Sequence, residues 1–303
     1  MAGSNNGFND LLNLVPRLQV RDKVSELSGG LTNINLKVST PTGDYVARIS
    51  SNKSSLLSID RQAEFENSKI AAQIGIGAPI YDFLPDFGLL VIGYLPGRTF
   101  TASDVATNLA RVAKSVKKLH SAKPFVRDFD MFEIQQNYLN IVTQRGFKLP
   151  EKYQDYSEHL NQMKAALAVL DEGKVSCNND LLAANFIDDG DQIWLIDYEY
   201  SGNNDACFEL GNIYSESELS YEQLVELVDN YYGKHRPEKV ARAWLFALLA
   251  RYGWSLWASI QNSISEIDFD FWAWGMQKYE RACLDFTSTQ FKSALTQVVT
   301  KSN

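Results

Sequence analysis

The chain has 303 residues, 45% of them hydrophobic, which is enough to bury one large or two moderate cores. Its net charge of −8 comes with no basic face, which argues against a nucleic-acid-binding protein. No window approaches the roughly 18 uninterrupted apolar residues of a membrane span, and residues 1–10 lack the apolar core of a signal peptide. Three cysteines without metal-ligand spacing favour a reduced, cytoplasmic protein.

The first part of the chain predicts a small sheet preceded by a tail. Residues 1–12 are expected to be mobile, since the segment begins with small and polar residues. Apolar alternation on both sides of residues 28–33 predicts two strands, and glycines between them let backbone N–H groups approach phosphates closely. An ordinary hairpin turn is the alternative. The candidate phosphate-binding residues are Ser28, Gly29, Gly30, Thr32 and Asn33.

Residues 45–49 predict the next strand, which carries Arg48. A planar guanidinium suits phosphate oxygens, although Lys37 competes for the same role. A loosely helical pattern over 58–74 follows and ends before a glycine, and residues 80–84 and 89–94 predict two further strands.

The segment 177–200 contains the pattern with the clearest chemistry. Apolar residues at 186–187 and 193–196 flank a polar, glycine-containing turn, which predicts a β-hairpin that returns Asp197 to the side of Asn185. Together with Asp180, this layout suits phosphoryl transfer: one carboxylate accepts a hydroxyl proton, while a carboxamide and a second carboxylate hold Mg²⁺. The alternative is a polar loop before a buried strand that ends in a capping aspartate.

The chain then becomes helical and rich in aromatic residues. Trp254 and Trp257 are three residues apart and therefore share one face of a helix. Trp272 and Trp274 are two apart, so only one of them can share that face if the segment is helical. Indole faces attract cations, including quaternary ammonium groups, which have no N–H to donate. Tryptophans that only pack a core are the alternative.

These motifs resemble the choline/ethanolamine kinase family, within the aminoglycoside-phosphotransferase-like group of protein-kinase-fold enzymes. Asp-Leu-Leu-Ala-Ala-Asn at 180–185 is similar to the family's catalytic loop, and Ile-Asp-Tyr-Glu-Tyr at 196–200 to its metal-binding strand end. Phe-Glu-Leu-Gly-Asn at 208–212 resembles the Phe-Asp-Ile-Gly-Asn that follows. One residue departs from the pattern, because Asn178 stands where the family usually has histidine.

The resemblance implies an α+β, bilobed, protein-kinase-like fold. A small antiparallel-sheet N-lobe over 13–95 would bind the nucleotide phosphates. A larger, mostly helical C-lobe over 96–303 would carry the catalytic loop, the metal ligands and the acceptor site.

The resemblance also implies roles for individual residues. Asp180 would accept the proton, and Asn185 and Asp197 would bind Mg²⁺, with Glu199 supporting the metal shell. Arg48 would grip the phosphates of ATP. The remaining residues assigned by resemblance are Glu64 as the partner of Arg48, Tyr94 near the adenine, and Glu216, Trp254, Trp257, Asp268 and Trp274 around the acceptor.

The function expected from this resemblance is ATP-dependent phosphorylation of choline to phosphocholine. The alternatives are a kinase for ethanolamine or another amino alcohol, and a weakened protein that binds choline or nucleotide because of Asn178. The expected partner is a small molecule, and the sequence leaves the oligomeric state open.

Overall fold

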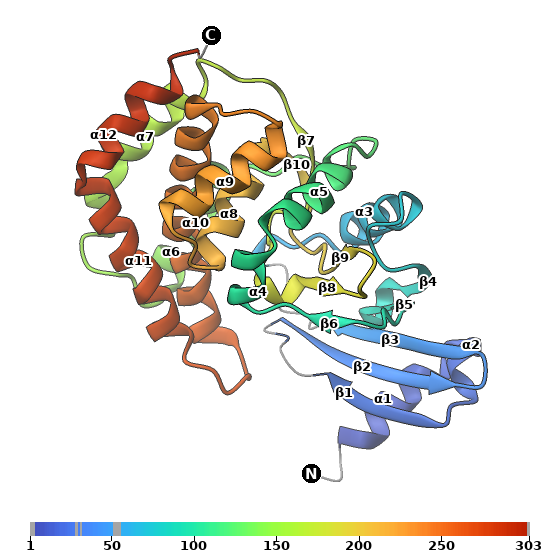
Figure 1. Ribbon diagram of the computed structural model, residues 1–303. Coiled ribbons are helices and arrows are strands. Elements are labelled where there is room, and N and C mark those ends of the chain that lie inside the picture. Colours follow the sequence, from blue (N-terminus) through green and yellow to red (C-terminus); the bar gives the residue numbers. More distant parts are fainter. Residues whose placement is uncertain (1–3, 28–29, 31, 51–55, 302–303) are drawn as a thin grey trace.

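The computed structural model describes residues 4–27, 30, 32–50 and 56–301 (Figure 1). Its N-terminal part is built on a five-stranded antiparallel sheet with the order β1-β2-β3-β5-β4. The strands are β1 (Lys23–Leu27), β2 (Asn33–Thr40), β3 (Gly43–Ser50), β4 (Ile80–Leu84) and β5 (Leu89–Gly93). The sheet-forming segments predicted from apolar alternation are therefore confirmed.

Two N-terminal helices, α1 (Ser4–Asn13) and α2 (Pro16–Gln19), pack against this sheet (Figure 1). Leu12, Val15 and Leu18 are fully buried in a cluster that includes Leu36 and Val38 of β2. The prediction of a mobile tail over 1–12 is therefore wrong for the described residues. The segment begins with polar residues, but Phe8 and Leu12 are four residues apart and therefore share one face of α1, which packs on the sheet.

Helix α3 (Arg61–Gln73) follows the third strand and lies between the sheet and the helical part of the molecule (Figure 1). The side chain of Asp60 accepts a hydrogen bond from the N–H of Ala63 at 3.0 Å, which starts the helix at Arg61. Helices α4 (Ala102–Thr107) and α5 (Leu109–His120) meet at Asn108.

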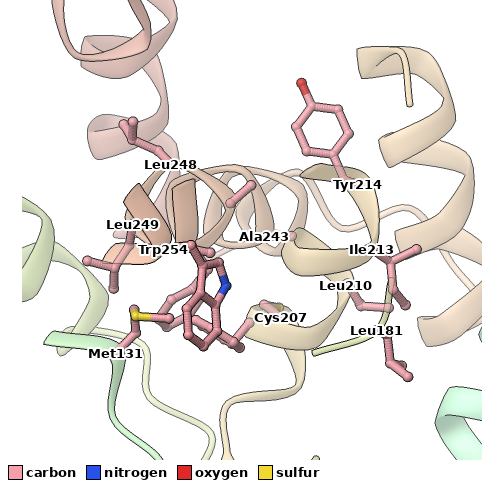
Figure 2. Close-up of a cluster of buried hydrophobic side chains, with 14 of the residues drawn as sticks. Met131, Leu181, Cys207, Leu210, Ile213, Tyr214, Ala243, Leu248, Leu249 and Trp254 are labelled. Carbon is pink, nitrogen blue, oxygen red and sulfur yellow. The ribbon is translucent and has the colours of Figure 1, made fainter. Parts of the chain in front are cut away.

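The C-terminal part is mostly helical and is organised around α10 (Pro237–Ile264), in which every residue from 238 to 261 is buried. Because it is buried on all sides, α10 forms the centre of the larger core (Figure 2). The other helices are α6 (Met131–Arg145), α7 (Ser157–Leu167), α8 (Ala206–Glu216), α9 (Tyr221–Tyr232), α11 (Phe271–Thr287) and α12 (Thr289–Val298).

Short strands connect the two parts and form the hairpin predicted from the sequence. Strand β8 (Phe186–Asp188) pairs antiparallel with β9 (Ile193–Leu195), and β6 (Arg98–Thr99) joins the outer side of β8. The remaining pair is β7 (Val175–Cys177) with β10 (Gly202–Asn204). The three cysteines are free thiols, and among the described residues no helix is long and apolar enough to cross a membrane.

Candidate active site

A buried carboxylate fixes the backbone of the loop that carries Asp180. Glu209 of α8 accepts hydrogen bonds from the backbone N–H groups of Asn178 and Asn179, at 2.8 and 3.0 Å. Its other oxygen lies 2.6 Å from Nε2 of His120, the last residue of α5. Because these groups are buried and paired, the base of the loop has one well-defined position.

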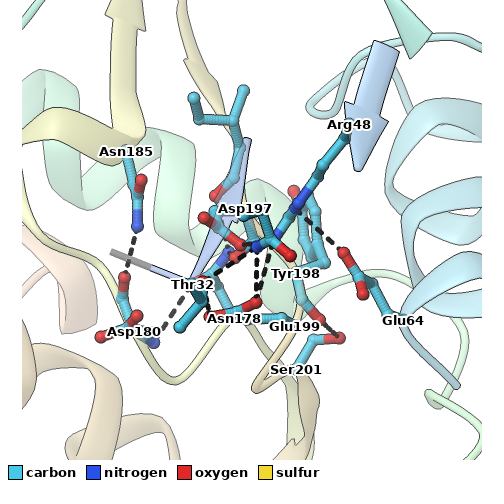
Figure 3. Close-up of polar contacts among 12 residues, drawn as sticks. Thr32, Arg48, Glu64, Asn178, Asp180, Asn185, Asp197, Tyr198, Glu199 and Ser201 are labelled. Carbon is cyan, nitrogen blue, oxygen red and sulfur yellow. Dashed lines mark hydrogen bonds and ion pairs between the residues drawn. The ribbon is translucent and has the colours of Figure 1, made fainter. Parts of the chain in front are cut away.

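Asn178 connects this loop to the end of the hairpin (Figure 3). Its Nδ2 donates to the backbone oxygens of Ile196 and Asp197, at 3.0 and 2.9 Å, and its Oδ1 accepts from the N–H of Asp180 at 3.1 Å. The amide therefore uses both of its donors and its acceptor to hold the predicted proton acceptor beside a predicted metal ligand.

The two predicted metal ligands flank the hairpin in sequence and lie near each other at its open end. The N–H of Ile196 donates to the backbone oxygen of Asn185 at 3.1 Å, and Nδ2 of Asn185 donates to the backbone oxygen of Asp180 at 2.7 Å. Asp197 has a left-handed backbone with φ of 63°, an uncommon conformation for a residue with a side chain. The hairpin thus brings Asp180, Asn185 and Asp197 together, as the sequence predicts.

Arg48 of β3 lies at the centre of a buried charged cluster (Figure 3). Its Nη1 is 2.9 Å from Oε1 of Glu64, and its Nη2 is 2.6 Å from Asp197 and 3.0 Å from Glu199. The predicted pairing of Arg48 with Glu64 is therefore present. Lys37 is engaged elsewhere, with Nζ 2.8 Å from Asp44 and 3.6 Å from the ring centroid of Tyr94.

A second arginine in this cluster was not found from the sequence. Nη1 of Arg61 lies 2.7 Å from Glu64 and 3.2 Å from Glu199, and its Nη2 donates to Oδ1 of Asn33 at 3.0 Å. The signal that could have identified it is local, because Arg61 precedes Glu64 by three residues on one helix and must lie on the same face.

Glu199 takes hydrogen bonds from four side chains of the N-terminal part. Besides the two arginines, Thr32 Oγ1 donates to it at 2.8 Å and Asn33 Nδ2 at 2.9 Å. Thr32 and Asn33 are thereby held against the C-terminal part of the chain, while Ser28 and Gly29 lie outside the described residues. The support of a metal ion by Glu199 stays a prediction.

A cavity of about 330 Å³ opens between the sheet and the hairpin. It is lined by Arg48, Asn185 and Asp197 on its polar side and by apolar residues, including Val46 and Ile92, on the other. The charged end of the cavity suits the phosphates of a nucleotide, and the apolar end suits its base. The other predicted residues that line this cavity are Gly30 and Tyr94.

Hard oxygen donors at this cavity suit a magnesium ion. The Nδ2 of Asn185 is engaged by the loop, which leaves its Oδ1 for a ligand role, and Asp197 supplies a carboxylate with a partly exposed side chain. Mg²⁺ binds such oxygens and keeps several waters, so two protein ligands are sufficient.

The electrostatic environment of Asp180 is strongly perturbed. Burial raises the pKa of its carboxyl well above the usual range, and the negative charges of Asp197, Glu216 and Glu199 raise it further. The ammonium of Lys278 acts in the opposite direction. A positive charge brought near Glu216 therefore makes Asp180 a more readily ionised group.

The predicted acceptor tryptophans occupy different environments. Trp254 lies in the hydrophobic cluster around α10 (Figure 2). Its ring centroid is 5.0 Å from that of Tyr200 and 6.5 Å from that of Phe129. Trp257 is also buried and donates from Nε1 to the hydroxyl of Tyr200 at 2.7 Å. Its ring lies 5.6 Å from that of Trp274, at an interplanar angle of 64°.

The face of Trp274 meets a charged pair that sequence reasoning missed. Nζ of Lys278 lies 4.3 Å from the Trp274 ring centroid and 2.6 and 2.7 Å from the two carboxylate oxygens of Glu216. Lys278 follows Trp274 by four residues on α11, a spacing that could have identified it. Asp268, in contrast, is exposed on the loop between α10 and α11 and does not line the cavity beside this pair.

Comparisons with known proteins agree with this geometry. A family model described as choline/ethanolamine kinase matches residues 24–240. A probable ethanolamine kinase of Arabidopsis thaliana is 24% identical over 304 aligned positions, which cover 84% of this chain and 77% of that protein.

Solved structures extend the likeness to the whole fold. A choline/ethanolamine kinase family protein from Mesorhizobium loti has a TM-score of 0.85 and 27% identity, covering 97% of this chain and 99% of that one. The choline kinase LicA from Streptococcus pneumoniae has a TM-score of 0.79 and 24% identity, covering 96% and 100%, and its likeness concerns the fold alone.

Proposed function

Because the chain belongs to the choline/ethanolamine kinase family, we propose that it transfers the γ-phosphoryl group of ATP to the hydroxyl of choline or ethanolamine. Membership of the family makes the chain a phosphotransferase that acts on an alcohol. The sequence favours choline as the acceptor, on the strength of three tryptophans. In the structure Trp254 and Trp257 are both buried in the core, so the aromatic contribution rests on the face of Trp274.

The observation that supports the proposal best is the contact of Asp180 with the charged end of the cavity. Asn185 donates from Nδ2 to the backbone oxygen of Asp180 at 2.7 Å, and Asn185 and Asp197 both line the cavity suited to a nucleotide. The negative charge of Glu216 also acts on Asp180, and Glu216 binds the lysine that lies over the face of Trp274. A hydroxyl bound at Asp180 would have its phosphoryl donor in the cavity, and we expect its cationic end on the side of Glu216.

In the proposed reaction, the carboxylate of Asp180 takes the proton of the acceptor hydroxyl as the oxygen attacks the γ-phosphorus. A bond from this oxygen to phosphorus forms, the bond from phosphorus to the β–γ bridging oxygen breaks, and ADP leaves with that electron pair. Asn178 holds Asp180 in place, and Arg48 offers a guanidinium to the phosphates. Asn185 and Asp197 would hold Mg²⁺, which when bound neutralises phosphate charge.

A cationic acceptor also assists its own activation in this proposal. Its ammonium near Glu216 would lower the pKa of Asp180, in the same direction as Lys278 does. The carboxyl would then lose its proton when the acceptor arrives, at the moment when a base is needed.

The test is Mg²⁺-dependent release of ADP from ATP, with choline, ethanolamine and an aminoglycoside offered in parallel and Asp180→Ala as the blank. We expect turnover with at least one of the two amino alcohols and a loss of about 10²- to 10⁴-fold in the variant, because proton acceptance is removed. Turnover with the aminoglycoside alone, or an Asp180→Ala enzyme as fast as the parent, would reject the proposal.

A further inference from the structure

Arg61 joins three parts of the charged cluster without facing the nucleotide cavity. Its Nη1 lies 2.7 Å from Glu64 on the same helix and 3.2 Å from Glu199 of the C-terminal part, and its Nη2 donates to Oδ1 of Asn33 at 3.0 Å. The arginine side chain is 18% exposed and those of both carboxylates only 4%, so these contacts are largely removed from water. Arg61 is not among the described residues that line the cavity, and any influence on a nucleotide must therefore pass through its partners.

One partner is the end of the glycine-containing loop that is predicted to bind phosphates. Asn33 is the first residue of β2 and follows Gly30, a residue of the cavity wall, by three positions. Its Oδ1 accepts from Arg61 and its Nδ2 donates to Glu199 at 2.9 Å, so both ends of this buried amide are held. Without Arg61, the amide oxygen would lose this donor, and the end of the loop would be held from one side only.

The other partners are two carboxylates that Arg61 shares with Arg48. Nη1 of Arg48 is 2.9 Å from Oε1 of Glu64, while Arg61 lies against the other oxygen of that carboxylate, Oε2. Both guanidinium groups also contact Oε2 of Glu199, Arg48 at 3.0 Å and Arg61 at 3.2 Å. Buried carboxylates need positive partners. Without Arg61, both would depend on Arg48 alone, and less of its charge would be available to a phosphate.

Resting on the function proposed above, we propose that Arg61 is a positioning residue for the phosphates of the nucleotide. It partly neutralises Glu64 and Glu199, which leaves more of the charge of Arg48, a residue that lines the cavity, for the phosphates. It also fixes the end of the glycine-containing loop through Asn33. An arginine that only stabilised the cluster would contribute to the free energy of unfolding and leave the affinity for nucleotide unchanged.

The experiment measures Kd for ADP and for adenosine, both with Mg²⁺ present, by titration calorimetry in the parent protein and in Arg61→Gln, which removes the charge of the side chain. We expect Kd for ADP to rise about tenfold, the size of one charge-assisted hydrogen bond. Kd for adenosine should stay the same, because adenosine has no phosphate. In steady-state kinetics, KM for ATP should rise while KM for the amino alcohol stays unchanged.

Arg242→Gln is the matched control. Arg242 of α10 is also a buried arginine, with Nε 2.5 Å from Asp205 and Nη1 donating to the backbone oxygen of Leu167 at 2.8 Å. None of these three residues lines the nucleotide cavity. The control should lose stability, as Arg61→Gln does, because a buried carboxylate loses its partner in each variant. It should keep the parent's Kd for ADP.

The binding measurement keeps the inference separate from the chemistry. An unchanged Kd for ADP in Arg61→Gln, or an equal loss for ADP and adenosine, would mean that Arg61 only stabilises the cluster, and the inference would be wrong. A parent protein that binds ADP but phosphorylates neither acceptor would overturn the proposed function, while the comparison of Kd values would still decide the role of Arg61. A parent protein that does not bind ADP would overturn both.

Should Arg61→Gln fail to fold, as judged by thermal unfolding, Arg61→Lys takes its place. Lysine keeps the positive charge but lacks the planar fork that reaches Asn33 and the two carboxylates together. We therefore expect the same changes in Kd and KM with a smaller size.

Discussion

Asn178 is the residue at which this chain departs from the family pattern, and its contacts explain how the loop accommodates it. Both of its donors and its acceptor are used, so that one amide fixes the backbone of Asp180 against that of Asp197. A neutral histidine has one donor and one acceptor and could satisfy only two of these three groups. The asparagine side chain thus has all three of its hydrogen-bonding groups satisfied within the loop and the end of the hairpin.

This predicts the behaviour of two variants at position 178. Asn178→Ala should lower kcat by about 10- to 100-fold with a smaller change in KM for ATP, because buried backbone groups lose their partners and Asp180 its position. Asn178→His should give no large gain in rate. Steady-state kinetics with both substrates measures each effect, and circular dichroism verifies that the variants are folded.

A strong acceleration by Asn178→His would have the opposite meaning. It would favour the alternative that the natural asparagine weakens the enzyme, and the chain would then be better described as a binding protein with residual activity.

At the scale of elements, the site depends on how closely α8 packs against α10. A Cβ on Gly211 would lie 2.2 Å from the backbone oxygen of Ala243 and 2.9 Å from the backbone N of Ala247, so only glycine allows this approach. The same helix carries Glu209, which holds the loop of Asp180, and Glu216 at the proposed acceptor site. The contact between the two helices therefore positions both ends of the proposed site.

Gly211→Ala should lower the free energy of unfolding by about 1–3 kcal/mol, because the added methyl group forces two buried backbones apart. Denaturant unfolding measures the loss. Gly7→Ala on α1 is the matched control: a Cβ there meets nothing within 4 Å, and alanine favours a helix by up to about 1 kcal/mol. A Gly211→Ala protein as stable as the parent would show that α8 can move away from α10 without cost.

At the scale of the whole molecule, the two lobes are joined by a buried charged cluster. Arg48 and Arg61 come from the N-terminal part, and Asp197 and Glu199 from the C-terminal part. Removing one member of such a cluster leaves the others uncompensated, whereas the complete set is balanced. The carboxylate of Asp180, the proposed proton acceptor, has no comparable compensation, and we therefore expect stability and function to oppose each other at this residue.

Asp180→Asn should abolish turnover and yet raise the melting temperature at pH 7 by about a few degrees. The folded pKa of Asp180 is raised, so above the unfolded value of about 4 the native state holds a proton that the unfolded chain has released, and stability falls as pH rises. Asparagine does not titrate, and the difference between the variant and the parent should vanish below about pH 4.

Asp188→Asn is the control, because this substitution should change the stability at neutral pH in the opposite direction. Its two hydrogen bonds from Arg111, at 2.6 and 2.7 Å, lower the pKa of this carboxyl, so its contribution is present at neutral pH and is lost in acid. This variant should melt below the parent at pH 7. Thermal unfolding from pH 4 to 8 measures both, and an Asp180→Asn protein that is less stable than the parent at neutral pH would contradict the argument.

The sequence by itself determined the local parts of this protein. Apolar alternation and a polar turn were sufficient for the hairpin that brings Asp197 back to Asn185, because a hairpin's register is set by its own turn. The pair of Arg48 and Glu64 followed from a resemblance, whereas the sequence left both a helix and a strand open for Trp272 and Trp274, which lie on α11 in the structure. The strands of the N-terminal sheet followed from alternation in the same way.

Only the tertiary structure decided the contacts between elements that are distant in sequence. The burial of Trp254 against Tyr200, the docking of α1 on the sheet, and the approach of Lys278 to Glu216 all depend on which helix faces lie together. A local pattern shows that a residue is on an apolar or polar face, but not what that face meets. The proposed acceptor site is made almost entirely of such contacts, and the pairing of Lys278 with Glu216 depends on α8 and α11 lying side by side.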